Sequence, residues 1–447
     1  MSRLKRIAIK ELIEWKNRKQ KKPLIINGAR QVGKTWLMKE FARSAYPKNA
    51  YFNFDRNPLL SKIFESDLEP QKIIQSLKLE SGINIEPENT LIIFDEIQEC
   101  PKALNSLKYF CEEAQNYHII CAGSLLGLYS HSGNSFPVGK VEYLNLYPLS
   151  FEEYLIAIGE EQLQTIIRNN EEELLKIFHN KIINYLKEYY YIGGMPEVVS
   201  NYIENKDYNQ VRTIQERILR DYRNDFSKHA PTELISKIEL VWDNISTQLS
   251  KENKKFIYGV LKTGARAKDY EDAIWWLQGA GLIYKVYRVK NSKVPLSSYK
   301  DYNAFKLYMF DTGLLSAKSH LDGKVVIDGN KIFQEFKGSL TENYVLQELI
   351  SNSVVDNIED LDIYYWTNED STSEIDFIMD YQGNACPIEV KAETNLKAKS
   401  LKYYVEKYQT KNNIRTSMSP YKKEEWLNNI PLYAIGCLKE YLKKGSE

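Results

Sequence analysis

Eight residues near the start of the chain have the types and spacing that bind phosphate groups. Residues 28–35 read GARQVGKT and fit the pattern G-x-x-x-x-G-K-[ST]. Backbone N–H groups of such a loop cradle the phosphates, while Lys34 would reach the β- and γ-phosphates and the Thr35 hydroxyl would ligate Mg²⁺. The phosphate-binding residues predicted in this way are Gly28, Ala29, Arg30, Gln31, Val32, Gly33, Lys34 and Thr35.

The segments on either side of this loop have the periodicities of a strand and a helix. An apolar run at residues 24–26 precedes it, and after it Trp36, Leu37, Phe41 and Ala42 recur at helical spacing. Strand, glycine loop and helix in this order place a helix N-terminus around an anion. The competing interpretation is a glycine-rich turn that fits the pattern by accident, and these flanks disfavour it.

Two adjacent carboxylates follow a second apolar run. Residues 91–96 read LIIFDE, as a Walker B strand does. Asp95 would hold the hydration shell of Mg²⁺, and Glu96 would orient or deprotonate the attacking water. Alone, an Asp-Glu pair can simply end a strand, but here it comes about sixty residues after a complete phosphate loop.

A third apolar run, residues 118–122, leads to Gly123 and Ser124. The carboxyl ends of parallel strands meet beside a bound nucleotide. We therefore expect Ser124 to sense the γ-phosphate or the water, with an ordinary Gly-Ser turn as the alternative.

The C-terminal part of the chain holds a different set of polar residues. Residues 374–379 and 387–391 alternate charged and apolar positions and predict two strands, which a hairpin through residues 383–384 would bring together. Asp376, Glu389 and Lys391 would then converge near one end, with Glu342 on a preceding helix. Carboxylates that hold Mg²⁺ beside a lysine suit metal-assisted phosphodiester hydrolysis. The alternative is an edge strand with ordinary alternating charges.

Length and composition bound the remaining possibilities. A chain of 447 residues is too long for one typical core. Its net charge is zero, but basic residues gather in residues 1–22, among them Arg6, and in residues 391–423. These stretches permit binding of DNA or RNA without demonstrating it, because lysines usually form solvated faces. The five cysteines include no C-x-x-C pair and predict reduced core thiols. With no leader and no membrane-length apolar run, we expect a cytoplasmic protein without a membrane partner.

The pattern along the chain divides it into four parts. Residues 1–150 are expected to form the nucleotide-binding sheet, residues 151–232 a helical subdomain, residues 233–325 a winged-helix-like domain, and residues 326–447 the part with the second polar set. Helices followed by an alternating run at residues 281–288 indicate the winged helix. Its candidate recognition helix, residues 269–278, is acidic and carries Trp275 and Trp276, which favours protein packing over DNA recognition.

Several local phrases make the chain resemble the prokaryotic AAA-type ATPases of the archaeal-ATPase-like group, whose C-terminal region is a domain of unknown function. The phrases are residues 27–35, 94–98, 122–124, 146–151, 193–197 and 311–314, continued by Glu342, Asp376, Glu389 and Lys391. The resemblance implies an α/β P-loop NTPase with a parallel sheet, a winged-helix middle and a PD-(D/E)XK nuclease-like tail. It also favours ATP over GTP as the nucleotide.

One departure from the family concerns a charge sensor. Related ATPases commonly carry Gly-Arg before the strand that leads to the phrase at residues 146–151, whereas this chain has Gly139-Lys140. Lysine keeps the charge but lacks the planar fork of arginine. Arg217, Arg220 and Arg223 are the candidate substitutes. An oligomer, in which such a group would act in trans, is compatible with the sequence.

The sequence therefore predicts an Mg²⁺-dependent ATPase in which Lys34, Glu96 and Ser124 carry the chemistry and Thr35 and Asp95 hold the metal. Nucleotide turnover would reposition the winged helix and tail, which would act on nucleic acid. One alternative is an ATP-gated nuclease that uses Asp376, Glu389 and Lys391, with Glu342 as a further metal ligand. Another is a nucleotide-switched interaction module with a non-catalytic tail.

Overall fold

The computed structural model describes residues 4–123, 137–251, 254–321, 331–353, 362–368, 373–393 and 397–445. The chain folds as two compact units. The smaller one, here the N-terminal unit, comprises Arg6–Tyr147 with Gly279–Gly281, and the rest of the described chain forms the C-terminal unit. In the described residues, no helix is both long and apolar enough to cross a membrane. The five cysteines are free and buried, as the sequence predicts.

The N-terminal unit is built on a parallel sheet. In the described part of this unit, five strands take the order β2-β3-β4-β1-β5, and each neighbouring pair is parallel. The strands are β1 (Leu24–Asn27), β2 (Lys48–Asn53), β3 (Thr90–Asp95), β4 (His118–Ala122) and β5 (Glu142–Asn145). β3 and β4 are buried along their whole length, which explains their continuous apolar sequences.

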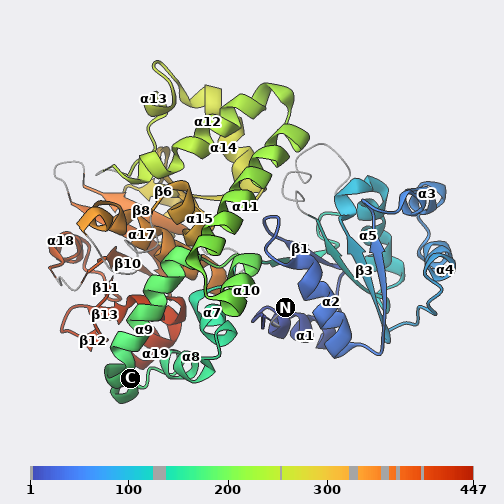
Figure 1. Cartoon of the computed structure of the whole chain (residues 1–447), viewed down its shortest axis with the longest axis horizontal. Coiled ribbons are helices and arrows are strands. Elements are labelled where there is room, and N and C mark those ends of the chain that lie inside the picture. The colour runs from blue at the N-terminus through green and yellow to red at the C-terminus, as the bar shows by residue number, and fades with distance from the viewer. Residues whose placement is uncertain are drawn as a thin grey trace. The chain divides into compact units, whose positions relative to one another are not determined.

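Helices cover both faces of this sheet (Figure 1). They are α1 (Ile9–Asn17), α2 (Lys34–Ala45), α3 (Pro58–Ser66), α4 (Pro70–Ser81) and α5 (Pro101–Glu113), with the short turn η1 (Ile97–Glu99) after β3. Helices α3, α4 and α5 bury their apolar residues in one core cluster with β2, β3 and β4. The ring of Trp15 in α1 packs edge-on against Phe41 of α2. Each of α3, α4 and α5 has a proline in its first turn. Backbone N–H groups there have no acceptor within the helix, so proline, which lacks this group, is tolerated.

The C-terminal unit begins with a helical region. Its helices are α7 (Phe151–Ala157), α8 (Glu161–Arg168), α9 (Glu172–Ile192), α10 (Pro196–Asn205), α11 (Tyr208–His229), α12 (Thr232–Leu249), α13 (Tyr258–Leu261) and α14 (Ala267–Gly279). Ser150 starts α7 with a capping box, in which its side chain and that of Glu153 satisfy each other's backbone N–H groups.

A mixed sheet forms the second half of this unit. Its order is β12-β13-β11-β10-β9-β8-β6-β7 within the described residues. The strands are β6 (Ile283–Val289), β7 (Lys300–Met309), β8 (Ile363–Thr367), β9 (Glu374–Tyr381), β10 (Asn384–Val390), β11 (Ile414–Ser417), β12 (Lys422–Lys423) and β13 (Asn428–Pro431). The flanking helices are η2 (Leu296–Tyr299), α15 (Thr312–Lys318), α17 (Lys331–Ser353), α18 (Lys399–Tyr408), η3 (Leu432–Cys437) and α19 (Leu438–Gly445).

The hairpin β6–β7 is continuous with the tail sheet. β6 pairs with β7 in antiparallel fashion and with β8 in parallel fashion. The strands predicted as the wing of a winged helix therefore lie in the same sheet as the residues predicted to be nuclease-like. The winged-helix and nuclease-like identities, and the boundaries at residues 150, 232 and 325, stay predictions.

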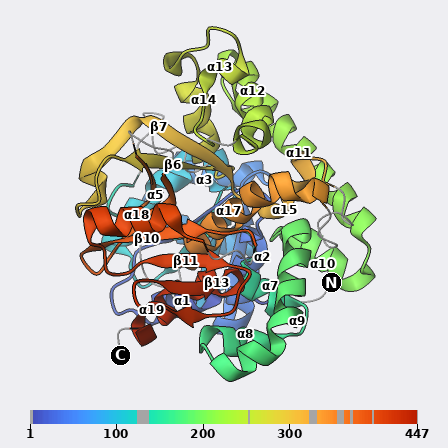
Figure 2. The same cartoon turned by 90° about the vertical axis from the view of Figure 1, so that its left-hand side faces the viewer.

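The expected hairpin between the two polar strands of the tail is confirmed, because β9 pairs antiparallel with β10 around Gln382 and Gly383. Helix α18 lies against this part of the sheet (Figure 2), where Leu401 and Tyr404 join the core cluster that contains Ile375 and Ile378. On β8, Tyr364 pairs with Ile378 but Trp366 with Ile375. One residue of β8 thus lies opposite two of β9, Asp376 and Phe377, which is a β-bulge.

The phrases at residues 146–151, 193–197 and 311–314 meet in a buried junction of the C-terminal unit. The Asp311 carboxylate accepts the backbone N–H of Gly194 at 2.7 Å and that of Leu314 at 2.8 Å. A Cβ on Gly194 would lie 2.1 Å from the Leu149 carbonyl oxygen, so only glycine fits there. These phrases therefore encode tight packing between segments that are far apart in the sequence.

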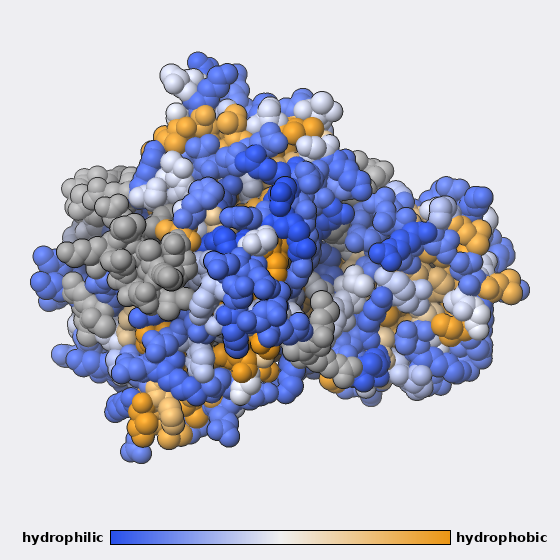
Figure 3. Space-filling model, in the orientation of Figure 1, coloured by the Kyte–Doolittle hydropathy of each residue, from blue (hydrophilic) through white to orange (hydrophobic). Residues whose placement is uncertain are grey.

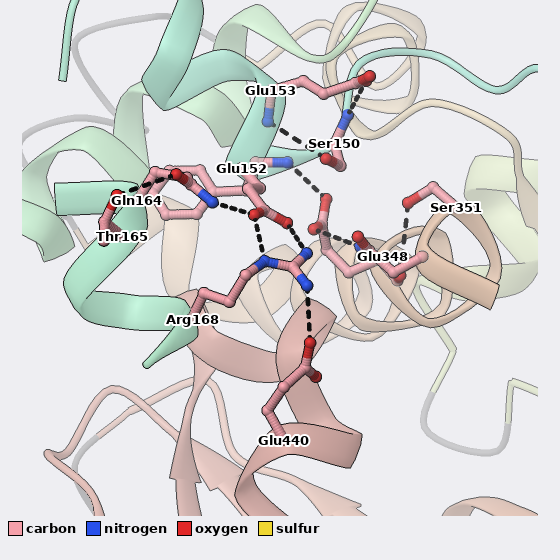
Figure 4. A network of polar contacts seen from close by, with 11 residues as sticks. Ser150, Glu152, Glu153, Gln164, Thr165, Arg168, Glu348, Ser351 and Glu440 are labelled. Atoms are coloured by element: carbon pink, nitrogen blue, oxygen red, sulfur yellow. Dashed lines mark hydrogen bonds and ion pairs between the residues drawn. The ribbon is translucent and has the colours of Figure 1, made fainter. Parts of the chain in front are cut away.

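Helix α17 supplies the polar side chains of this junction. Glu348 accepts the N–H of Phe151 at 2.9 Å, and Gln347 accepts the N–H of Thr312 at 2.8 Å. Figure 4 shows Glu348 beside a second network, in which the Arg168 guanidinium binds the carboxylates of Glu152 and Glu440. Glu348 and Gln347 thus satisfy buried N–H groups at the starts of α7 and α15, while Arg168 of α8 joins α7 to α19.

The start of α9 presents an apolar surface. Leu174, Ile177 and Phe178 are exposed and lie about one helical turn apart. Figure 3 shows apolar atoms at the lower left of the view, where Figure 1 places this end of α9. Their exposed fractions are 38% for Leu174, 72% for Ile177 and 39% for Phe178.

Candidate functional site

The predicted phosphate loop lies between β1 and α2, as its sequence context requires. Gly28 has φ +143°, and a Cβ there would lie 2.2 Å from the carbonyl oxygen of Leu146. Gln31 and Gly33 also have positive φ values, 64° and 96°. The loop thus combines left-handed turns with a close backbone approach, which explains why glycine is needed at its first position.

Lys34 is folded back onto the loop that precedes it. Its Nζ donates to the carbonyl oxygens of Gly28 at 2.7 Å and Ala29 at 2.8 Å. Burial lowers the pKa of Lys34 to about 8, although Glu96 and Asp95 oppose the shift. A buried ammonium held by neutral carbonyl oxygens is suited to exchange them for an anion. The observed arrangement fits a phosphate group.

Asp95, at the end of β3, joins the predicted metal ligands. Its Oδ2 accepts the Thr35 hydroxyl at 2.8 Å and the Tyr51 hydroxyl at 2.7 Å. Only 3% of Asp95 is exposed, so its oxygens lie where water is largely excluded. Hydroxyl and carboxylate oxygens are the ligands that Mg²⁺ prefers, and this pair therefore fits that ion.

Glu96 follows directly and has a left-handed backbone, with φ 53°. The Gln98 side chain donates to its Oε2 at 2.7 Å, which fixes one carboxylate oxygen. Gln98 is itself buried, and its Oε1 has no hydrogen-bond partner within the described part of the chain. Glu96 is thus held by a neighbour rather than left to rotate in solvent.

Two participants in this site have no signal in the sequence motifs. Tyr51 comes from β2, and Lys39 of α2 places its Nζ 4.0 Å from the centre of the tyrosine ring. Burial and the bond to Asp95 raise the pKa of Tyr51 to about 12, so it remains a donor. Gln98 belongs to a phrase of the family resemblance, yet nothing in its spacing indicates that it contacts Glu96.

The positions of the other residues predicted to sense the γ-phosphate say less about their roles. Ser124 lies outside the described residues. Lys140 pairs with Glu112 at 2.7 Å, with 44% of its side chain exposed. In the C-terminal unit, Arg217 pairs with Glu197 and Arg223 with Asp243. None of these pairs assigns a charge sensor.

The polar set of the tail is organised around two lysines that the motif does not include. Glu342 pairs with Lys254 and accepts the Tyr308 hydroxyl at 3.2 Å. Lys306 in β7 is completely buried and pairs with Glu374. Burial alone would raise the pKa of Glu342, but the two lysines outweigh it and hold the pKa below its usual range.

Asp376 and Glu389 lie at the same end of the β9–β10 hairpin. Asp376 accepts the backbone N–H of Val390 at 2.7 Å, and burial raises its pKa to about 7, with Glu342 adding to the rise. Glu389 pairs with Lys391 at 2.6 Å. Its second oxygen, Oε2, is buried and has no hydrogen-bond partner in the described ranges.

The predicted tail ligands do not form a metal site as they stand. Within the residues described, no three His, Cys, Asp or Glu side chains are arranged to hold a metal ion. Ammonium groups provide much of the positive charge that a metal would otherwise supply. The donor set of the tail therefore does not fit a bound metal in this arrangement.

Comparison with known proteins bears on the N-terminal unit most directly. Residues 20–155 match the family model described as an AAA domain, a range that includes the phosphate loop and both carboxylates. Over this range the N-terminal unit is similar to AAA domains, and it is called the AAA domain below. Its sheet of parallel strands flanked by helices fits this assignment. Residues 183–324 and 337–435 match two families described only as domains of unknown function (DUF8612 and DUF4143).

Matches beyond the AAA domain are distant. No curated protein matches the chain. A Walker-type ATPase of Pyrococcus abyssi aligns with 71% of this chain and 96% of its own, at 13% identity and a TM-score of 0.45. The Orc1 protein of Aeropyrum pernix, solved in complex with DNA, aligns with 70% of this chain and 91% of its own, at 12% identity and a TM-score of 0.27. Scores this low support no argument about activity.

Proposed function

We propose that the AAA domain binds ATP with Mg²⁺ and hydrolyses it, and that turnover drives a conformational change of the chain. The observation that carries the proposal is the arrangement of Lys34, Thr35 and Asp95. The buried Lys34 ammonium is bonded to carbonyl oxygens of the loop. The next residue, Thr35, donates its hydroxyl to the Asp95 carboxylate at the end of β3. This arrangement brings phosphate and metal ligands together at the carboxyl ends of β1 and β3.

Binding would use groups that the free domain already holds in place. The loop N–H groups would surround the phosphates, and the Lys34 ammonium would leave the carbonyls of Gly28 and Ala29 for phosphate oxygens. Thr35 and Asp95 would hold Mg²⁺, which when bound neutralises charge on the β- and γ-phosphates. Apart from this change of partners by Lys34, which takes place on binding, the groups are already in position, so electrostatic stabilisation costs little at the moment of reaction.

Hydrolysis would rest on Glu96. Gln98 fixes one of its oxygens. The other oxygen can then accept a proton from the water that attacks the γ-phosphate, or orient that water. Ser124 stays a proposed γ-phosphate sensor.

The direct test measures phosphate release and nucleotide binding by the full chain. Lys34→Ala should abolish both, whereas Glu96→Gln should retain binding of a fluorescent ATP analogue and lose turnover. Arg43→Ala is a matched control, because Arg43 lies on the same helix α2 and its guanidinium pairs with Glu40 on the surface. Unchanged hydrolysis in both Lys34→Ala and Glu96→Gln refutes the proposal.

A nuclease in the tail is the second candidate. The observation in its favour is the buried, unpaired Oε2 of Glu389 beside the Lys391 ammonium, since an orphaned buried oxygen is costly unless it binds something. Against it stand the lysine partners of Glu342 and Glu374. We therefore treat DNA and RNA as candidate substrates of a site that would first have to rearrange.

Cleavage assays on single- and double-stranded DNA and RNA, with Mg²⁺ or Mn²⁺, decide this second candidate. Cutting should disappear in Asp376→Ala and in Lys391→Ala but survive in Lys34→Ala. If none of the four substrates is cut, the tail is non-catalytic and the chain is better described as a nucleotide-switched interaction module.

A further inference from the structure

Arg6 is a buried guanidinium in a segment that the sequence marks only as basic. It is 7% exposed, unlike the surface lysines around it. Its Nη1 donates to the carbonyl oxygen of Val32 at 2.9 Å, and its Nη2 donates to that of Tyr147 at 2.6 Å. The planar fork of one side chain thereby joins two segments that are more than a hundred residues apart.

Both acceptors belong to the immediate surroundings of the phosphate loop. Val32 directly precedes Gly33 and Lys34, so its carbonyl lies at the point where the loop turns into α2. Tyr147 follows Leu146, whose N–H donates to the Asn27 carbonyl at 2.8 Å. The Leu146 carbonyl oxygen also approaches the start of the loop so closely that a Cβ on Gly28 would lie 2.2 Å from it.

The phosphate loop is therefore held at both of its ends by one short segment. Leu146 supports the beginning of the loop by direct backbone contact, and Arg6 ties the end of the loop to the next residue, Tyr147. Removal of the guanidinium would release the end of the loop at Val32. It would also leave the carbonyl oxygens of Val32 and Tyr147 without this charged donor.

We propose that Arg6 is a positioning residue of the phosphate loop. It holds the loop in the conformation that binds phosphate before the nucleotide arrives. The inference rests on the proposed function. The Arg6 bonds described above go to backbone carbonyls of the loop end and of Tyr147, so we expect the residue to act on affinity rather than on the chemical step. Preorganisation of this kind lowers the ordering cost of binding.

Arg6 and Tyr147 are also the first and last residues of the continuous stretch that forms the N-terminal unit. The side chain of Arg6 and its acceptor Tyr147 therefore lie at two of the four points where the chain passes from one unit to the other.

The test compares Arg6→Lys and Arg6→Gln with the wild type. Lysine keeps the charge but can no longer bridge both carbonyls as a planar fork. We expect the Kd for a fluorescent ATP analogue to rise on the order of tenfold in Arg6→Lys and further in Arg6→Gln. The kcat at saturating ATP should stay within about twofold, because Glu96 and Gln98 are untouched.

Arg18→Gln is the matched control, because the Arg18 guanidinium pairs with the Glu142 side chain on the surface of the same unit. Circular dichroism verifies that each variant is folded, and if Arg6→Gln misfolds, Arg6→Lys alone decides. An active wild type whose Arg6→Lys variant keeps the original Kd overturns the inference, as does a loss of kcat with unchanged Kd. A wild type that neither binds nor hydrolyses ATP instead overturns the proposed function.

Discussion

The buried carboxyl of Glu348 should make the stability of the chain depend on pH in a predictable direction. Burial raises its pKa to about 8 from an ordinary value of 4.5, and the nearby Glu152 and Glu153 add to the rise. Between these two values the folded chain holds a proton that the unfolded chain releases. Stability contributed by Glu348 is therefore complete below the lower value and is lost as the pH rises through the higher one.

The size of this effect follows from the two pKa values. From about pH 6 to about pH 9 the wild type should lose about 2.5 kcal/mol of unfolding free energy through this group alone. Glu348→Gln keeps the acceptor for the Phe151 N–H and the shape of the protonated acid but cannot ionise. The variant should therefore become more stable relative to the wild type by that amount as the pH rises.

Urea unfolding of the full chain at both pH values, followed by circular dichroism, measures this difference. The unfolding free energy of the wild type is subtracted from that of the variant at each pH, which removes the contribution of the other titrating groups. Glu161→Gln serves as control, because hydrogen bonds to its own backbone N–H and to Lys5 lower the pKa of Glu161, which places its titration far below this range. A stability difference for Glu348→Gln that is the same at both pH values refutes the reasoning.

Three further substitutions test other contacts. Tyr51→Phe removes a donor to Asp95, and we expect the Mg²⁺ concentration for half-maximal hydrolysis to rise severalfold, about tenfold at most, in a metal titration; an unchanged titration contradicts this role of the hydroxyl. Gly194→Ala drives a Cβ against the Leu149 carbonyl, so urea unfolding should show a loss of more than about 2 kcal/mol, and wild-type stability would show that the backbone yields there. Lys306→Met removes the buried ammonium that pairs with the partly exposed Glu374 and acts on the nearby Glu342, which should cost up to about 3 kcal/mol in the same assay, while a neutral result would mean that the ammonium does not stabilise these acids.

The sequence alone was sufficient for the local elements of the AAA domain. The strand, loop and helix around residues 28–35 follow from short-range periodicity and from glycine's backbone freedom, and the β9–β10 hairpin follows from alternation and a turn. Tyr51 and Arg6 could not be predicted, because each reaches its partner across a sheet or from another segment. Tyrosine on a strand and arginine in a basic stretch have many ordinary uses, and only the fold distinguishes them.

In the tail, the sequence indicated which carboxylates lie near each other but not what balances their charge. Lys306 lies in a strand of mixed composition and Lys254 in a lysine-rich stretch, so neither stands out from its neighbours. Their pairing with Glu374 and Glu342 depends on contacts across β7 and α17. The bulge at Asp376 likewise follows from the register against β8, which local patterning does not determine.

The parallel pairing of β6 with β8 has a practical consequence for dissecting the chain. A fragment that stops near residue 325 would carry β6 without the strand that satisfies one of its two edges. Unpaired backbone N–H and C=O groups along an apolar strand recruit other chains, so such a fragment is expected to aggregate. Expression of the middle region on its own therefore calls for inclusion of the chain through β13.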